Sequence, residues 1–121
     1  MKNDKNIIYN KSYDFTLRIV KLYKFLSKEH KEYILSKQLL RSGTSIGALI
    51  REAKFAQSKA DFIHKLSIAL KEANESDSWI DLLYDSEFLS KKMHNSIKQD
   101  IDEIISILVT IIKSSKRVKS S

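Results

Sequence analysis

Residues 36–75 read SKQLLRSGTSIGALIREAKFAQSKADFIHKLSIALKEANE and decide the fold. This stretch contains both glycines of the chain and its most regular apolar pattern. In its first half, apolar and small side chains recur at helical spacing. One face of the predicted helix comprises Leu35, Leu39, Ser42, Ile46, Leu49, Ile50, Ala53 and Ala56. The pattern predicts a helix from about Glu32 to Gln57.

Gly43 and Gly47 lie four residues apart on a flank of that face. Each costs about 1 kcal/mol relative to alanine in the interior of a helix. A helix that accepts this cost usually gains close contact with a neighbouring helix, because no Cβ keeps the two backbones apart. The alternative is a break in the helix at Gly43. We favour close helix packing at Gly43 and Gly47.

The second half of the stretch begins with Ser58, followed three residues later by Asp61, which is typical of a helix start. A helix from about Lys59 to Asp85 would have a core stripe of Phe62, Leu66, Ala69, Ala73, Ile80 and Leu83. Ile68, Trp79 and Leu82 lie about 120° or more away from this stripe. A helix that packs on one side only has no use for a second apolar set, so we predict that these three residues contact another subunit.

Residues 36–76 resemble the signature of a family of four-helix-bundle proteins. These proteins are related to the protein encoded by the 23S ribosomal RNA intervening sequence. The fold of that family is similar to that of the accessory variability protein of diversity-generating retroelements. The likeness runs from about Phe15 to Ile112, although the family usually has asparagine where this chain has Leu49. The resemblance implies an antiparallel up-down bundle that forms a ring, commonly a pentamer, with a basic surface. It also implies a reverse transcriptase as a protein partner.

The composition agrees with an all-α protein of one domain. The chain has 121 residues, two glycines, no proline and no cysteine. The lack of turn residues argues against a many-turned β protein, and the lack of cysteine excludes disulfides and fits a reducing compartment. The N-terminus has no run of signal-peptide length, and residues 101–112 are too short and polar to span a bilayer. We expect a cytoplasmic protein that does not contact membranes.

We divide the chain into a flexible N-terminus at residues 1–10, a four-helix bundle at 11–115 and a basic tail at 116–121. Ser12 is the expected cap of the first helix, which ends near His30. A fourth helix begins between Ser90 and His94 and has a core stripe of Ile97, Ile101, Ile104, Leu108 and Ile111. The residues expected to be fully buried are Leu39, Ile46, Phe62, Leu66, Ile101 and Leu108.

The charge of the chain is unevenly distributed. The formal net charge is +7. Residues 1–31 contain eight Lys/Arg and three Asp/Glu, whereas residues 58–86 contain three Lys/Arg and six Asp/Glu. This asymmetry suits either a basic face for a polyanion or complementary faces between subunits.

The candidate nucleic-acid-binding residues are the cations that lie away from the predicted core. They are Lys11, Arg18, Lys21 and Lys28 on the first helix, extended by Arg41, Arg51, Lys116 and Arg117. These side chains would contact phosphates. The alternative is that they form a solvated face with no ligand.

No arrangement in the sequence indicates catalysis, a metal or a cofactor. Ser42 to Gly47 lacks the preceding strand and the Gly-Lys-Ser/Thr ending of a phosphate loop. His30, His64 and His94 are widely separated. We therefore expect a non-enzymatic, oligomeric nucleic-acid-binding protein, with RNA as the expected ligand and a role as accessory to a reverse transcriptase or RNA–protein complex. The alternative is a structural or adaptor ring for a protein partner, with basic charge serving solubility and subunit complementarity.

Overall fold

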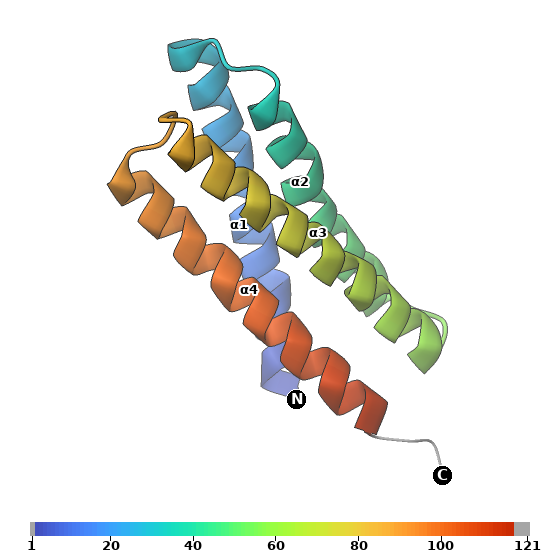
Figure 1. Ribbon diagram of the computed structural model, residues 1–121. Coiled ribbons are helices and arrows are strands. Elements are labelled where there is room, and N and C mark those ends of the chain that lie inside the picture. The colour runs from blue at the N-terminus through green and yellow to red at the C-terminus, as the bar shows by residue number, and fades with distance from the viewer. Residues whose placement is uncertain (1, 118–121) are drawn as a thin grey trace.

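The computed structural model describes the backbone of residues 2–117 and the side chains of residues 5–117. Four helices follow one another: α1 at Lys2–His30, α2 at Leu35–Lys54, α3 at Lys59–Asp85 and α4 at Lys91–Arg117. They run alternately up and down, and no strand occurs in residues 2–117 (Figure 1). The prediction of an all-α antiparallel four-helix bundle is confirmed. Its assembly into a ring remains a prediction.

Each helix packs against its neighbours in the chain, and α4 closes the bundle against α1. The α1–α2 and α3–α4 connections lie at one end (Figure 1). The N-terminal end of α1 and the C-terminal end of α4 lie at the other. Within the described part of the chain, none of the helices combines the length and apolar character that crossing a membrane requires.

The core follows the predicted stripes, with one correction. Leu39, Ile46, Leu66, Ile101 and Leu108 are all fully buried. Phe62, also predicted to be fully buried, is only partly so. It lies in the first turn of α3 at the end of the bundle, where the Lys5 ammonium is 4.8 Å from its ring centroid. The ring is thus covered in part by a lysine of α1.

The expected start of the first helix at Ser12 is wrong. α1 begins at Lys2, and the Ser12 hydroxyl donates a hydrogen bond to the Tyr9 carbonyl at 3.1 Å inside the helix. No glycine or proline interrupts this segment, and Ile8 lies seven residues before Phe15, so both reach the core. The division predicted between residues 1–10 and 11–115 therefore falls inside α1.

The second helix begins three residues later than predicted, because Glu32 serves as its cap. The Glu32 carboxylate accepts hydrogen bonds from the backbone N–H groups of Ile34, Leu35 and Ser36 at 3.1, 3.1 and 2.7 Å. Burial raises the pKa of Glu32, but these bonds outweigh it and the net pKa lies below the usual value. α3 spans the predicted residues, and the Ser58 hydroxyl accepts the Asp61 N–H at 3.0 Å.

α2 runs without a break through both glycines, which face α1. A Cβ added at Gly43 would lie 3.0 Å from both Cγ1 and Cγ2 of Ile19. A Cβ at Gly47 would lie 2.7 Å from the Thr16 hydroxyl oxygen. The missing side chains thus let α1 and α2 approach closely.

Candidate nucleic-acid interface

Two of the predicted phosphate-binding cations lie in the seam between α1 and α4. Lys11 forms an ion pair with Glu103, and this hydrogen bond raises the pKa of Lys11. Arg18 forms an ion pair with Asp100 and donates a hydrogen bond to the Ser96 hydroxyl at 3.0 Å. Both cations therefore have an anionic partner within the chain.

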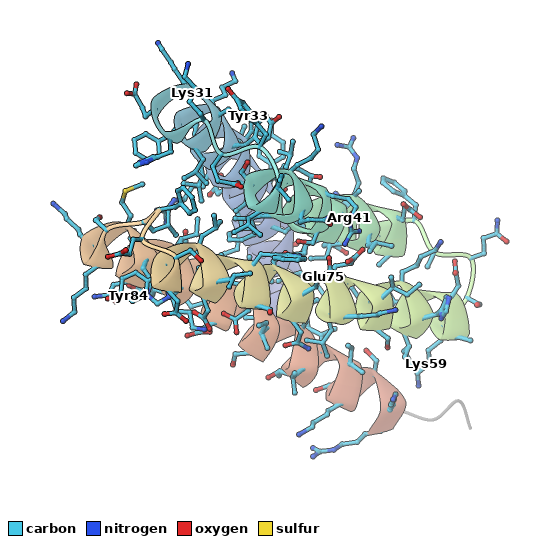
Figure 2. All side chains as sticks on the ribbon, turned by 45° about the horizontal axis from the view of Figure 1, so that its top comes forward. Lys31, Tyr33, Arg41, Lys59, Glu75 and Tyr84 are labelled. Carbon is cyan, nitrogen blue, oxygen red and sulfur yellow. The ribbon has the colours of Figure 1, made fainter. Side chains whose placement is uncertain are left out.

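Arg41 is held in the same way on the other side of the bundle. Its guanidinium donates to Glu72 at 3.1 Å and to Glu75, both on α3. Figure 2 shows Arg41 and Glu75 facing one another between α2 and α3. The hydrogen bonds to Glu72 and Glu75 raise the pKa of Arg41.

The remaining five candidates are exposed. Lys21, Lys28 and Arg51 form no ion pair with any of residues 5–117, and neither do Lys116 and Arg117. Lys116 and Arg117 end α4, at the opposite end of the bundle from Lys28. The structure therefore separates them from Lys21 and Lys28. Residues 118–121 of the predicted tail lie outside the described residues.

Two segments, one in α1 and one at the start and along the length of α2, contain lysine and arginine but no acidic residue. Residues 15–28 and 33–51 contain no aspartate or glutamate. We call the exposed cations of these two segments that lack an ion pair among the described residues the basic face. They are Lys21, Lys24, Lys28, Lys37 and Arg51.

Four of the six carboxylates of α3 form ion pairs with the neighbouring helices. Lys98 of α4 donates to Asp77 at 2.6 Å and to Asp81 at 3.1 Å. His94 Nε2 lies 2.8 Å from Asp81, and the hydrogen bond with His94, followed by that from Lys98, lowers the pKa of Asp81. These pairs tie α3 to α4, as Arg41 ties α3 to α2. The acidic helix thus uses its charge on its two neighbours.

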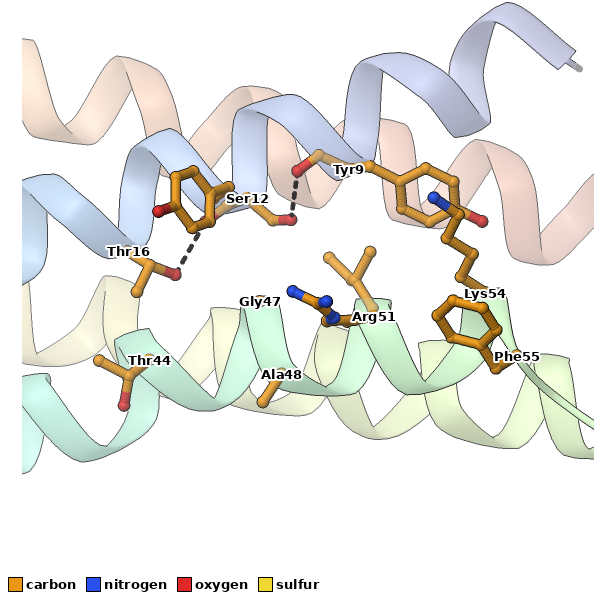
Figure 3. Close-up of a pocket in the computed structure, with 11 residues that line it drawn as sticks. Tyr9, Ser12, Thr16, Thr44, Gly47, Ala48, Arg51, Lys54 and Phe55 are labelled. Carbon is orange, nitrogen blue, oxygen red and sulfur yellow. Dashed lines mark hydrogen bonds between the residues drawn. The ribbon is translucent and has the colours of Figure 1, made fainter.

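A groove of about 460 Å³ lies beside the basic face, between α1 and α2 (Figure 3). Its lining includes Tyr9 and Tyr13 from α1, and Arg51, Lys54 and Phe55 from the end of α2. The Lys54 ammonium lies 5.1 Å from the Tyr9 ring centroid and 5.9 Å from that of Phe55. No lining residue is acidic. Burial raises the pKa of Tyr9.

The sequence pattern did not predict this groove. Tyr9 fell in the segment expected to be flexible, and Tyr13 and Phe55 stood outside the predicted core stripes. The available signal was the spacing of Tyr9 and Tyr13, which are four residues apart and so lie on one side of a helix. Their position opposite Phe55 depends on how α1 packs on α2.

The residues predicted to contact another subunit differ in exposure. Leu82 is 42% exposed, which is high for leucine. Trp79 is half-buried against the core and its Nε1 donates to Glu75 at 3.2 Å. Ile68 is half-buried. Leu82 is therefore the member of this set that offers the most free apolar surface.

Comparison with known proteins identifies the chain's relatives. The model of the family described as 23S rRNA-intervening sequence protein matches residues 4–110. A crystal structure of a protein with unknown function from the S23 ribosomal protein family of Bacteroides thetaiotaomicron VPI-5482 has a TM-score of 0.90 and 55% sequence identity, covering 91% of this chain and 98% of that one. No curated protein matches the chain. The four-helix bundle and the family match together show that this chain belongs to the 23S rRNA-intervening sequence protein family.

Proposed function

We propose that this protein is a non-enzymatic RNA-binding protein that works as a homo-oligomer and contacts phosphates through its basic face. The observation that carries the proposal is the absence of carboxylates from residues 15–28 and 33–51, where five exposed cations have no ion-pair partner among residues 5–117. Cations without a partner attract counterions, which a nucleic acid can displace.

The basic face would bind RNA more tightly in an oligomer, because each subunit contributes one copy of it. Each phosphate that the protein neutralises adds about 0.7–0.9 to the slope of log affinity against log salt. A homo-oligomer, for which we propose the pentameric ring implied by the resemblance, presents one such face per subunit. Several weak contacts then give strong binding that tolerates different sequences.

The alternative function is an adaptor ring that binds a protein, such as the reverse transcriptase implied by the resemblance. One observation favours it: Lys11, Arg18 and Arg41 are paired within the chain. Fewer cations are therefore available to a ligand than the number of lysines and arginines in the sequence suggests. Leu82 supplies exposed apolar surface for a protein contact.

The test compares two triple variants of equal charge. Lys21, Lys24 and Lys28 are changed to glutamate in one, and Lys59, Lys71 and Lys113, exposed cations of α3 and α4, in the other. Arg18 is left intact because its reversal would also disrupt the contact with Asp100. Binding to a labelled RNA hairpin with a single-stranded extension is followed by fluorescence anisotropy at several salt concentrations.

We expect the α1 variant to bind at least about tenfold more weakly and with a smaller salt slope than the α3/α4 variant. Circular dichroism and light scattering must show unchanged helicity and particle size in both. Equal losses in the two variants would mean that total charge, and not this face, determines binding. A parent protein that binds no RNA at low salt would favour the adaptor function.

A further inference from the structure

We propose that the groove between α1 and α2 holds a single-stranded RNA segment, in which one unpaired base stacks on Tyr13, a neighbouring base stacks on Phe55, and a phosphate contacts Arg51 and Lys54. The inference rests on the proposed RNA-binding function and adds the kind of RNA that is recognised. It makes the protein selective for single strands over duplex.

The size of the groove fits a single strand of RNA. Its volume of about 460 Å³ lies within the range of sites for small molecules, about 300–1,000 Å³. It can exist because Gly47 contributes no side chain and Ala48 only a methyl group, while the two helices stay close together. A duplex would not enter a space of this size.

The rim of the groove carries aromatic rings that are open to solvent. Tyr13 of α1 is 62% exposed, and Phe55, which directly follows α2, is 71% exposed. Neither ring pairs with another aromatic ring among residues 5–117. Burying these two rings in the core would stabilise the fold, so their exposure on the surface suggests a binding role. Stacking on nucleic-acid bases is such a role, because every base has a π-face.

The charges in the groove fit a phosphate. Arg51 forms no ion pair with any described residue, and Lys54 contacts the Tyr9 and Phe55 rings in place of a carboxylate. Figure 3 shows both side chains reaching from α2 toward the groove. Since no acidic residue lines it, an anion meets no repulsion there. A neutral or basic ligand would not use this charge.

A hydroxyl group of the groove can act as an acceptor. Thr16, whose side chain points from α1 toward α2 in Figure 3, donates to the Ser12 carbonyl at 2.8 Å. Its oxygen keeps a free lone pair, which suits an N–H group of a base. In a duplex such N–H groups are paired and the base faces are stacked, so this set of contacts requires an unpaired base.

The experiment removes the aromatic faces but keeps apolar bulk. Tyr13 and Phe55 are both changed to leucine, and Tyr33→Leu, an exposed tyrosine at the α1–α2 connection (Figure 2), is the matched control. Each protein is titrated with a short labelled RNA of mixed sequence, alone and annealed to its complement. The same RNA carrying 5-iodouracil is photo-crosslinked to the parent, and the linked peptide is identified by mass spectrometry.

We expect the double variant to lose about tenfold in affinity for the single strand, with no change for the duplex, and Tyr33→Leu to lose nothing. The crosslink should map to residues 9–16 or 48–55. Unchanged single-strand affinity in the double variant, or equal losses for both RNAs, would overturn the proposal.

Two further outcomes separate the inference from the function on which it rests. A parent that binds duplex as tightly as single strand, with aromatic variants that bind normally, would overturn the groove site and leave RNA binding by the basic face intact. A parent that binds neither RNA would overturn both. A double variant with altered particle size by light scattering would assign the groove to a protein contact and reject the nucleotide site.

Discussion

At the scale of single residues, Gly43 and Gly47 determine how closely α1 lies on α2. Gly43 faces Ile19, which is buried and β-branched, so its two γ carbons cannot both turn away from an added Cβ. Gly47 faces Thr16 beside the groove. The same close approach therefore shapes both the core and the surface of this helix pair.

Gly43→Ala tests this contact. Alanine gains about 1 kcal/mol in helix propensity, but overpacking against Ile19 costs about 1–3 kcal/mol. We expect a net loss of about 1 kcal/mol in unfolding free energy, measured by urea denaturation. In an Ile19→Ala background the same change should stabilise the protein, because both γ carbons are gone. A stabilised single variant would show that the helices separate at little cost.

Ion pairs are the other feature at this scale. The side chains of Lys11, Arg18 and Arg41 remain 40–51% exposed, and pairs this open to solvent add little stability. Their main consequence is electrostatic, because each removes a cation from the charge that a ligand can meet. The five cations of the basic face have no such partner among residues 5–117.

At the scale of elements, the start of α2 depends on a side chain outside the helix. Lys31 has a positive φ of 53°, which turns the chain, and Glu32 then folds its carboxylate onto the first N–H groups of α2. An anion at this position also interacts favourably with the positive end of the helix dipole. Glu32 thus orients α2, and with it the glycines and the groove.

Glu32→Gln should lower the unfolding free energy by about 1–2 kcal/mol at pH 7, because hydrogen bonds to a charged acceptor are replaced by weaker ones. The pKa of Glu32 is lower in the folded than in the unfolded protein, so its contribution is complete above the unfolded value, near 4.5, and is lost as pH falls through the folded value. The difference between parent and variant should therefore shrink in acid.

Urea denaturation from pH 7 to pH 3 measures this effect, and the exposed neighbour Glu29→Gln is the control. The control should change stability by less than about 0.5 kcal/mol at every pH. A Glu32→Gln effect that is the same across the pH range would mean that the charge of the carboxylate is not what caps the helix.

At the scale of the whole molecule, the four helices place charge of different kinds on different sides. α3 pairs its carboxylates with Arg41 on one neighbour and Lys98 on the other. α1 and α2 keep their exposed cations on the basic face. One exposed apolar residue, Leu82, remains on α3 away from that face. This distribution would let one side of each subunit serve assembly while another serves RNA.

Assembly gives a direct prediction. We expect light scattering at micromolar concentration to show a mass that is a multiple of 14.0 kDa, five times this value for a pentamer. Leu82→Lys should reduce the mass without loss of helicity, because it places a charge in an apolar contact. Leu17→Lys, at a similarly exposed leucine of α1, should leave it unchanged. A monomeric parent would reject the oligomer.

The sequence was sufficient for the helices because their pattern is local. Leu39, Ile46, Leu66 and Leu108 recur at the helical period and are buried, and Ser58 caps α3 through Asp61 three residues away. One prediction from a local signal was wrong, because a contact with a distant part of the chain determined where the helix begins. Ser12 resembles a cap, but the chain before it contains Ile8, which gains more by joining the core.

Taken alone, the sequence determined the fold class, the start of α3 and most of the core, since all three depend on residues within a few turns of one another. Only the tertiary structure decided which cations are free. Arg18 and Asp100 are 82 residues apart, and Arg41 and Glu75 are 34 apart, so their pairing depends on how the helices align. The groove depends on the same alignment, because it brings Tyr9 and Tyr13 of α1 against the glycine-bearing side of α2.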